Sequence, residues 1–144
     1  MHKLMLLITG AAVMSLAIIV VGDLNRDIRA DKAATQAFMR QKLNHAQSAL
    51  EGITLEKFDL VAKSALRLRD MTHTNIFVVL KTPDYRQHTL DYQKNIEALF
   101  QAATDNNLDA ASEAYQKVTR SCVDCHRYFR KAQRSKSVVE GSHT

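Results

Sequence analysis

The sequence is poor in residues that interrupt helices. Its 144 residues include only four glycines and one proline. Both are costly inside a helix, so their scarcity favours long helices, whereas a β-sandwich or barrel would need far more turn residues. The chain also lacks a glycine-rich phosphate loop and a basic run interleaved with aromatics, so a nucleic-acid partner is not expected. No carboxylate pair or Ser/His/Asp constellation stands out, and no enzymatic activity is expected.

The first twenty-two residues differ from the rest of the chain. A basic start is followed by an apolar run from Leu4 to Val21, with no charge before Asp23. This order is typical of an export signal, and about 18 apolar residues can also span a bilayer. Residues 1–22 are therefore either a removed signal peptide or an N-terminal anchor through residues 4–21. Both place the remainder outside the cytoplasmic membrane, in the periplasm, with a domain at 23–137 and a polar tail at 138–144.

Hydrophobic periodicity predicts four amphipathic helices. The first (residues 30–51) has an inner face of Met39, Leu43, Ala46, Leu50 and Ile53, which Phe38 and Ala49 widen, and Gly52 is its expected stop. The second starts after a Thr54 cap, with Phe58, Val61, Ala65 and Leu68 inside. Residues 72–89 read as a connection, with Thr82-Pro83 as a helix-start signal, before a third helix at 90–104 with Tyr92, Ile96, Leu99 and Ala103 inside. The fourth has the inner face Leu108, Ala111, Tyr115, Val118, Cys122, Cys125 and Phe129. The fold class is all-α, an antiparallel four-helix bundle, which can house a cofactor between facing helices.

The only two cysteines stand three residues apart, and a histidine directly follows the second, in Cys122-Val-Asp-Cys125-His126. A thioredoxin-type dithiol would need a helix N-terminus and accompanying strands, and a zinc site would need about four ligands. A C-x-x-C-H motif is instead typical of c-type haem attachment. In this arrangement we expect both cysteines to form thioethers with the haem and His126 to be the proximal axial ligand. We expect one covalent haem c.

An all-helical chain with C-x-x-C-H near its C-terminus resembles the cytochrome c-prime family, including its low-spin electron-transfer relatives. The resemblance covers most of residues 30–134. It implies that Arg130, four residues after the histidine, packs beside His126. It also implies that a residue of the first helix occupies the distal side of the haem, and that dimers can form through outer helix faces.

The distal side has two candidates in Phe38-Met39. Met39 belongs to the predicted inner face and is a candidate distal iron ligand, since a thioether paired with histidine suits a haem that carries electrons. Phe38 is the competitor in the haem pocket, and a bulky ring there would leave a five-coordinate iron that binds NO or CO. Bis-histidine ligation through His73 or His88 stays open. Arg40 and Lys42 lie beside the distal position, where they either pair with haem propionates or are exposed to solvent.

The leading functional hypothesis is a monohaem electron carrier, and the alternative is a cytochrome c-prime-like protein that binds NO or CO. The formal net charge is +5, with a basic cluster after the motif at Arg127, Arg130, Lys131, Arg134 and Lys136. Such a cluster is either a solvated helix end or a docking patch for an acidic redox partner protein.

Overall fold

The computed structural model describes residues 29–74, 77 and 80–141, and for residues 136–141 it describes the backbone alone. The chain divides into two compact units, Met1–Met39 and Arg40–Thr144. The second unit contains both cysteines and most of the helical core. The description below concerns this unit unless residues before Arg40 are named.

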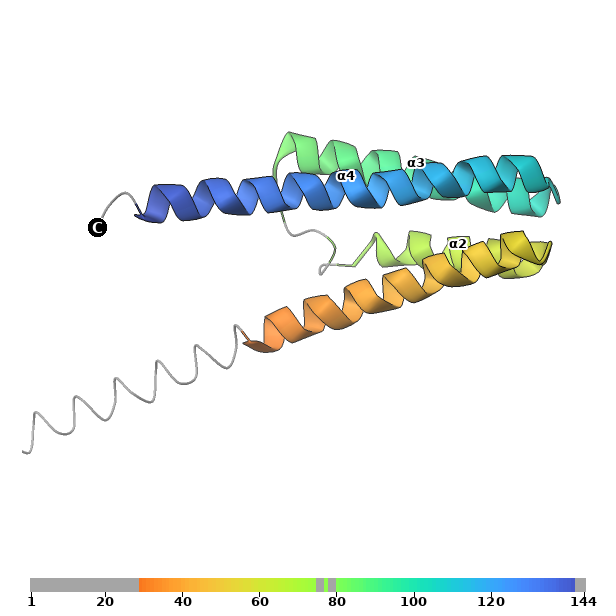
Figure 1. Cartoon of the computed structure of the whole chain (residues 1–144), viewed down its shortest axis with the longest axis horizontal. Coiled ribbons are helices and arrows are strands. Elements are labelled where there is room, and N and C mark those ends of the chain that lie inside the picture. The colour runs from red at the N-terminus through yellow and green to blue at the C-terminus, as the bar shows by residue number, and fades with distance from the viewer. Residues whose placement is uncertain (1–28, 75–76, 78–79, 142–144) are drawn as a thin grey trace, which may run out of the picture. The chain divides into compact units, whose positions relative to one another are not determined.

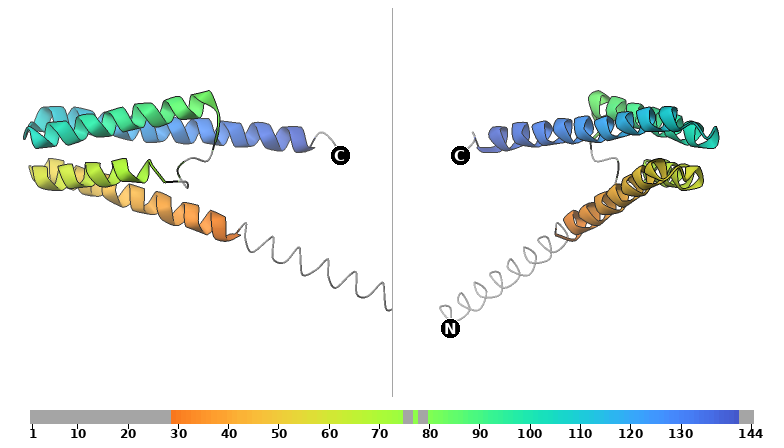
Figure 2. Two further views of the ribbon diagram at one scale, coloured as in Figure 1. Left: turned by 180° about the vertical axis from the view of Figure 1, so that it is seen from behind. Right: turned by 45° about the vertical axis from the view of Figure 1, so that its right-hand side comes forward.

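The described residues form helices and no strands (Figure 1). The first helix covers residues 29–54. It is followed by α2 (Phe58–Met71), α3 (Pro83–Thr104) and α4 (Leu108–Gly141). In both views α3 and α4 lie side by side and run in opposite directions (Figures 1 and 2), and α2 packs against α3. The expected all-α, four-helix architecture is confirmed.

The third helix begins seven residues earlier than the predicted residue 90. Thr82 is its N-cap, with extended backbone, and its hydroxyl accepts a hydrogen bond of 3.3 Å from the Tyr85 amide. Pro83 follows in the first turn, where a missing N–H costs nothing. The Thr82-Pro83 start signal was therefore correct. The mostly polar residues 84–89 belong to the helix, although periodicity alone had left them outside it.

The end of the first helix also differs from the prediction. The helix continues past Gly52 to residue 54. Thr54 does not cap α2, because its hydroxyl donates to the Glu51 carbonyl at 2.9 Å, inside the first helix. Gly52 is needed for a close approach, since a Cβ there would lie 2.7 Å from Cγ2 of Val61. The chain turns instead at Glu56, which has a positive φ of 52°.

The core confirms two predicted inner faces almost completely. In α3 all four predicted residues are buried, and in α2 the three after Phe58 are fully buried while Phe58 is half-buried. In α4 the buried members are Ala111 and Val118, whereas Leu108 is exposed.

The inner face predicted for the first helix is confirmed only in part. Leu43 and Leu50 are 57% and 44% exposed, against the prediction, while Phe38, Ala49 and Ile53 are buried, as predicted. The buried face is therefore rotated toward Phe38 and Ala49, the residues expected at its edge. Lys42 lies on this buried face and interrupts its hydrophobic pattern.

The predicted export segment or anchor, residues 1–22, lies outside the described residues. Within the part that is described, no helix is long and apolar enough to cross a membrane. The last helix runs on to Gly141, past the predicted domain boundary at residue 137.

Candidate functional site

The two cysteines lie on the inward-facing side of α4. Cys122 and Cys125 are both free and half-buried, and they continue the stripe that contains the buried Ala111 and Val118. A spacing of three residues places side chains close together on one helix face. His126 is exposed and directly follows, so it is rotated about 100° from Cys125. The helix therefore presents two thiols and an imidazole along one edge.

A polar contact fixes α4 against α3 next to Cys122. The Asn95 side-chain amide donates to the Ser121 hydroxyl at 2.8 Å and also lies 3.4 Å from the Lys117 carbonyl. This bond joins two helices one residue before the first cysteine, so it sets the rotation of the motif. The sequence analysis missed it, because a polar pair between helices leaves no periodic signal.

The interior facing the cysteines contains a buried cation. The Lys42 Nζ lies 3.8 Å from the ring centroid of Tyr92 and 4.1 Å from that of Phe77. Burial lowers the pKa of Lys42 to about 8, against an opposing electrostatic effect from Cys122 and Cys125. Sequence analysis left Lys42 between solvent exposure and propionate pairing, and the structure shows that its ammonium is not out in solvent.

Tyr92 adds a second polar group without a partner. Its side chain is 2% exposed, and its hydroxyl is the one buried side-chain polar atom in the described residues that forms no hydrogen bond. Burial raises the pKa of Tyr92 far above its ordinary value, with smaller contributions from the two cysteines. The phenol therefore stays neutral, and its O–H donates to no hydrogen-bond acceptor. Periodicity identified Tyr92 only as a core residue.

The surroundings of the motif also change the pKa values of its own side chains. Burial raises the pKa of the Cys122 and Cys125 thiols, and the charge of Lys42 partly offsets that rise. Burial lowers the pKa of His126, and the positive charges of Lys42 and Arg130 lower it further. At neutral pH the imidazole is consequently neutral, the form in which a histidine binds a metal. Arg130 is one helical turn beyond His126, and its packing against the imidazole stays a prediction.

The two histidines considered for bis-histidine ligation are His73 and His88. His73 is exposed just after α2. The His88 ring contacts that of Tyr128, with centroids 5.3 Å apart and planes tilted by 52°, and the Tyr128 hydroxyl lies 2.9 Å from that of Thr82. His88 is thus engaged with α4 two residues beyond His126.

The two distal candidates belong to the first unit, which ends at Met39. Phe38 is 8% exposed and Met39 is half-buried. Phe38 and Met39 precede Lys42 by four and three residues, and both spacings place side chains on one helix face.

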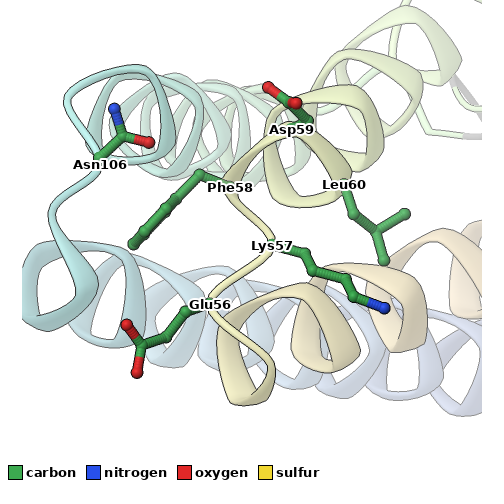
Figure 3. A pocket seen from close by; sticks show the side chains of 6 residues that line it. All are labelled: Glu56, Lys57, Phe58, Asp59, Leu60 and Asn106. Carbon is green, nitrogen blue, oxygen red and sulfur yellow. The ribbon is translucent and has the colours of Figure 1, made fainter.

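A separate depression lies at the other end of the bundle, beside the turns that contain Glu56 and Asn106 (Figure 3). It is lined by Glu56, Lys57, Phe58, Asp59, Leu60 and Asn106. It holds neither histidine nor cysteine. Cys122 lies 14 residues along α4 from Leu108, or about 21 Å. This depression is therefore not part of the cysteine site.

The residues around the cysteines fit a covalently held haem. Two half-buried thiols supply the attachment points, and the neutral His126 supplies an axial ligand. The interior opposite them offers two aromatic rings together with two polar groups, Lys42 and Tyr92, whose charge and hydroxyl have no counter-ion or acceptor. A zinc site fits less well, because the described residues contain no group of three His, Cys, Asp or Glu side chains that could hold a metal ion.

Comparison with known families decides the assignment. The family model described as cytochrome C' matches residues 12–130. The chain belongs to the cytochrome c' family. The predicted resemblance is confirmed, and membership implies a covalently bound haem c. No curated protein and no solved structure matches the chain significantly.

Proposed function

We propose that this cytochrome c' family member is an exported monohaem electron-transfer protein, with haem held by Cys122 and Cys125 and with His126 as the proximal ligand. The observation that carries the proposal is the arrangement on α4, where two half-buried thiols share the inner face and the His126 imidazole follows directly. The haem supplies one-electron redox chemistry when bound.

The protein's own residues position the cofactor and limit its access to water. The Asn95–Ser121 bond fixes the rotation of α4, so both sulfurs face the bundle interior. The apolar residues Ile96, Leu99 and Val118 are fully buried or nearly so, and they keep the adjoining core dry. A rigid, dry surround suits electron transfer, because little has to reorganise when the charge on the iron changes.

The distal side decides between the leading function and its alternative. Met39 as sixth ligand would give a low-spin electron carrier. Phe38 in that place would give a five-coordinate iron open to NO or CO. One observation favours the alternative: Phe38 is buried, while Met39 is only half-buried.

The proposal includes a partner and a location. An exported cytochrome exchanges electrons with another protein, and the basic cluster around Arg127 and Arg130 suits an acidic redox partner. Residues 4–21 would tether it to the membrane if they are retained. The exposed Leu43 and Leu50 provide an outer apolar face through which a homodimer can form.

Mass spectrometry and absorption spectra of the purified, exported protein test the proposal. We expect a mass increased by one haem that survives denaturation, and loss of that increment in Cys122→Ala/Cys125→Ala. A chain that is exported intact without haem would overturn the function.

Spectra of the ferric, the ferrous and the CO-treated ferrous protein distinguish the two distal arrangements. A low-spin ferric spectrum that becomes high-spin in Met39→Ala identifies the carrier with a sulfur ligand. A high-spin ferric spectrum with ready CO uptake, unaffected by Met39→Ala and altered by Phe38→Ala, identifies the gas-binding form. Phe38→Ala and Met39→Ala serve as each other's control because they are adjacent on one helix.

A further inference from the structure

Lys42 is a cation whose ammonium lies over two aromatic rings and has no ion-pair partner among the described residues. Across the described residues no carboxylate lies within ion-pair distance of its ammonium, and its contacts are the faces of Tyr92 and Phe77. Lys117, in contrast, is exposed and pairs with Glu113 at 2.8 Å. A buried charge without an ion pair is expensive. Its presence on an inner face is therefore not explained by stability.

The location of this charge is the cysteine face of α4. The Tyr92 ring under the Lys42 ammonium is one helical turn before Asn95, and the Asn95 side chain bonds Ser121 next to Cys122. From this position the charge of Lys42 acts on the thiols of Cys122 and Cys125 and on the imidazole of His126. These are the three groups that would attach the haem and ligate its iron. The charge therefore lies at the cofactor site and not at the protein surface.

The aromatic cage stabilises the ammonium without cancelling it. A carboxylate partner would neutralise the charge, so that a redox centre nearby would feel only a dipole. Cation–π contacts offset part of the desolvation penalty and leave the full positive charge in place. The nearby Tyr92 hydroxyl, also buried, adds a second donor dipole and no negative charge.

We propose that Lys42 is an electrostatic positioning residue of the haem site, whose caged positive charge raises the reduction potential of the iron. The inference rests on the proposed function, since it requires a haem at Cys122 and Cys125. The oxidised haem centre carries one more positive charge than the reduced one, so a fixed cation nearby disfavours the oxidised form. Burial limits screening by water and salt, which keeps the effect strong.

The test is the reduction potential of the haem-loaded protein, measured by spectroelectrochemical titration. Lys42→Met removes the charge and keeps an unbranched chain of similar length, and Lys42→Gln removes it with a polar replacement. Lys42→Arg retains the charge. Lys94→Met is the matched control, because Lys94 is exposed on α3, two residues from Tyr92.

We expect both neutral variants to have a lower potential. At the wild-type midpoint their ferric-to-ferrous ratio should rise about tenfold, which is about 59 mV for a one-electron couple. Lys42→Arg keeps the charge, so its potential should stay close to the wild-type value. Lys94→Met should leave the potential unchanged. A purely structural role would alter stability without this dependence on charge.

Two results would overturn the inference. One is a potential in Lys42→Met and Lys42→Gln that equals that of Lys94→Met. The other is a change of spin state on removing Lys42, which would make its amine an iron ligand and not a fixed charge. Failure of the proposed function looks different, because the wild-type protein would then carry no haem to titrate.

Discussion

Gly52 is a position where the structure and helix propensity make opposite predictions. The residue lies in the last turn of the first helix, where replacing glycine by alanine normally stabilises by up to about 1 kcal/mol. An added Cβ, however, would lie 2.7 Å from Val61 Cγ2, 3.0 Å from the Val61 amide nitrogen and 3.1 Å from the Lys57 carbonyl oxygen. Two of these atoms are backbone, and the valine side chain is stiff.

The clash should outweigh the propensity gain. Overpacking of this kind costs about 1–3 kcal/mol, so Gly52→Ala should lower the free energy of unfolding by about 1–2 kcal/mol after the helical gain is subtracted. The Lys57 amide also donates to the Gly52 carbonyl at 2.8 Å, so the turn has little freedom to move away. Urea denaturation of the haem-loaded protein, followed by far-UV circular dichroism, measures the change.

Val61→Ala supplies the control for this reasoning. It removes the nearest side-chain atom and leaves the two backbone contacts, so Gly52→Ala should cost less in that background. A double-mutant cycle should therefore show a favourable coupling between the two substitutions. If Gly52→Ala proves as stable as the wild type or more so, the close approach of Gly52 to Val61 is not a constraint and the reasoning is refuted.

Three further predictions concern the cofactor site. Burial lowers the pKa of Lys42 from its ordinary 10.5 to about 8 in the folded protein. Between these two values the unfolded chain binds more protons than the folded one, so the free energy of unfolding should rise with pH from about 8 to 10.5, by about 3 kcal/mol at most. Urea denaturation of Lys42→Met across this range should lack the rise. Tyr92→Phe should be neutral or stabilising by about 1 kcal/mol in the same assay, because the hydroxyl is buried without a partner, and a marked loss would show that the loaded haem supplies an acceptor. Asn95→Ala should destabilise by about 1 kcal/mol through the lost bond to Ser121, and a double-mutant cycle with Ser121→Ala should be non-additive.

Local chemistry was readable from the sequence, and the rotation of the first helix was not. The haem motif and the inner face of α3 depend on spacings along one segment, and Tyr92, Ile96 and Leu99 give an unambiguous stripe. The first helix has two apolar faces one position apart, and the larger side chains, Leu43 and Leu50, are on the wrong one. Packing selects the face with Ala49, because a small residue lets helices approach closely.

Lys42 explains why periodicity failed on that helix. A lysine can bury its aliphatic stem along apolar neighbours, and here its ammonium is buried as well, over two aromatic rings. Any hydrophobicity pattern scores such a position as polar and moves the inner face away from it. The unpartnered hydroxyl of Tyr92 was equally hidden, since a sequence shows which residue is inside and not whether its polar atom finds a partner.

The same rotation connects the cation to the ligation question. Turning the first helix by one position replaces the series Met39, Leu43, Leu50 on the inner face with Phe38, Lys42, Ala49. Phe38 and Met39 lie four and three residues before Lys42, and both spacings place side chains on one helix face. A fixed charge at Lys42 and sulfur ligation by Met39 are therefore compatible. Measuring the reduction potential and the spin state of the same variants separates the effect of the charge from the identity of the sixth ligand.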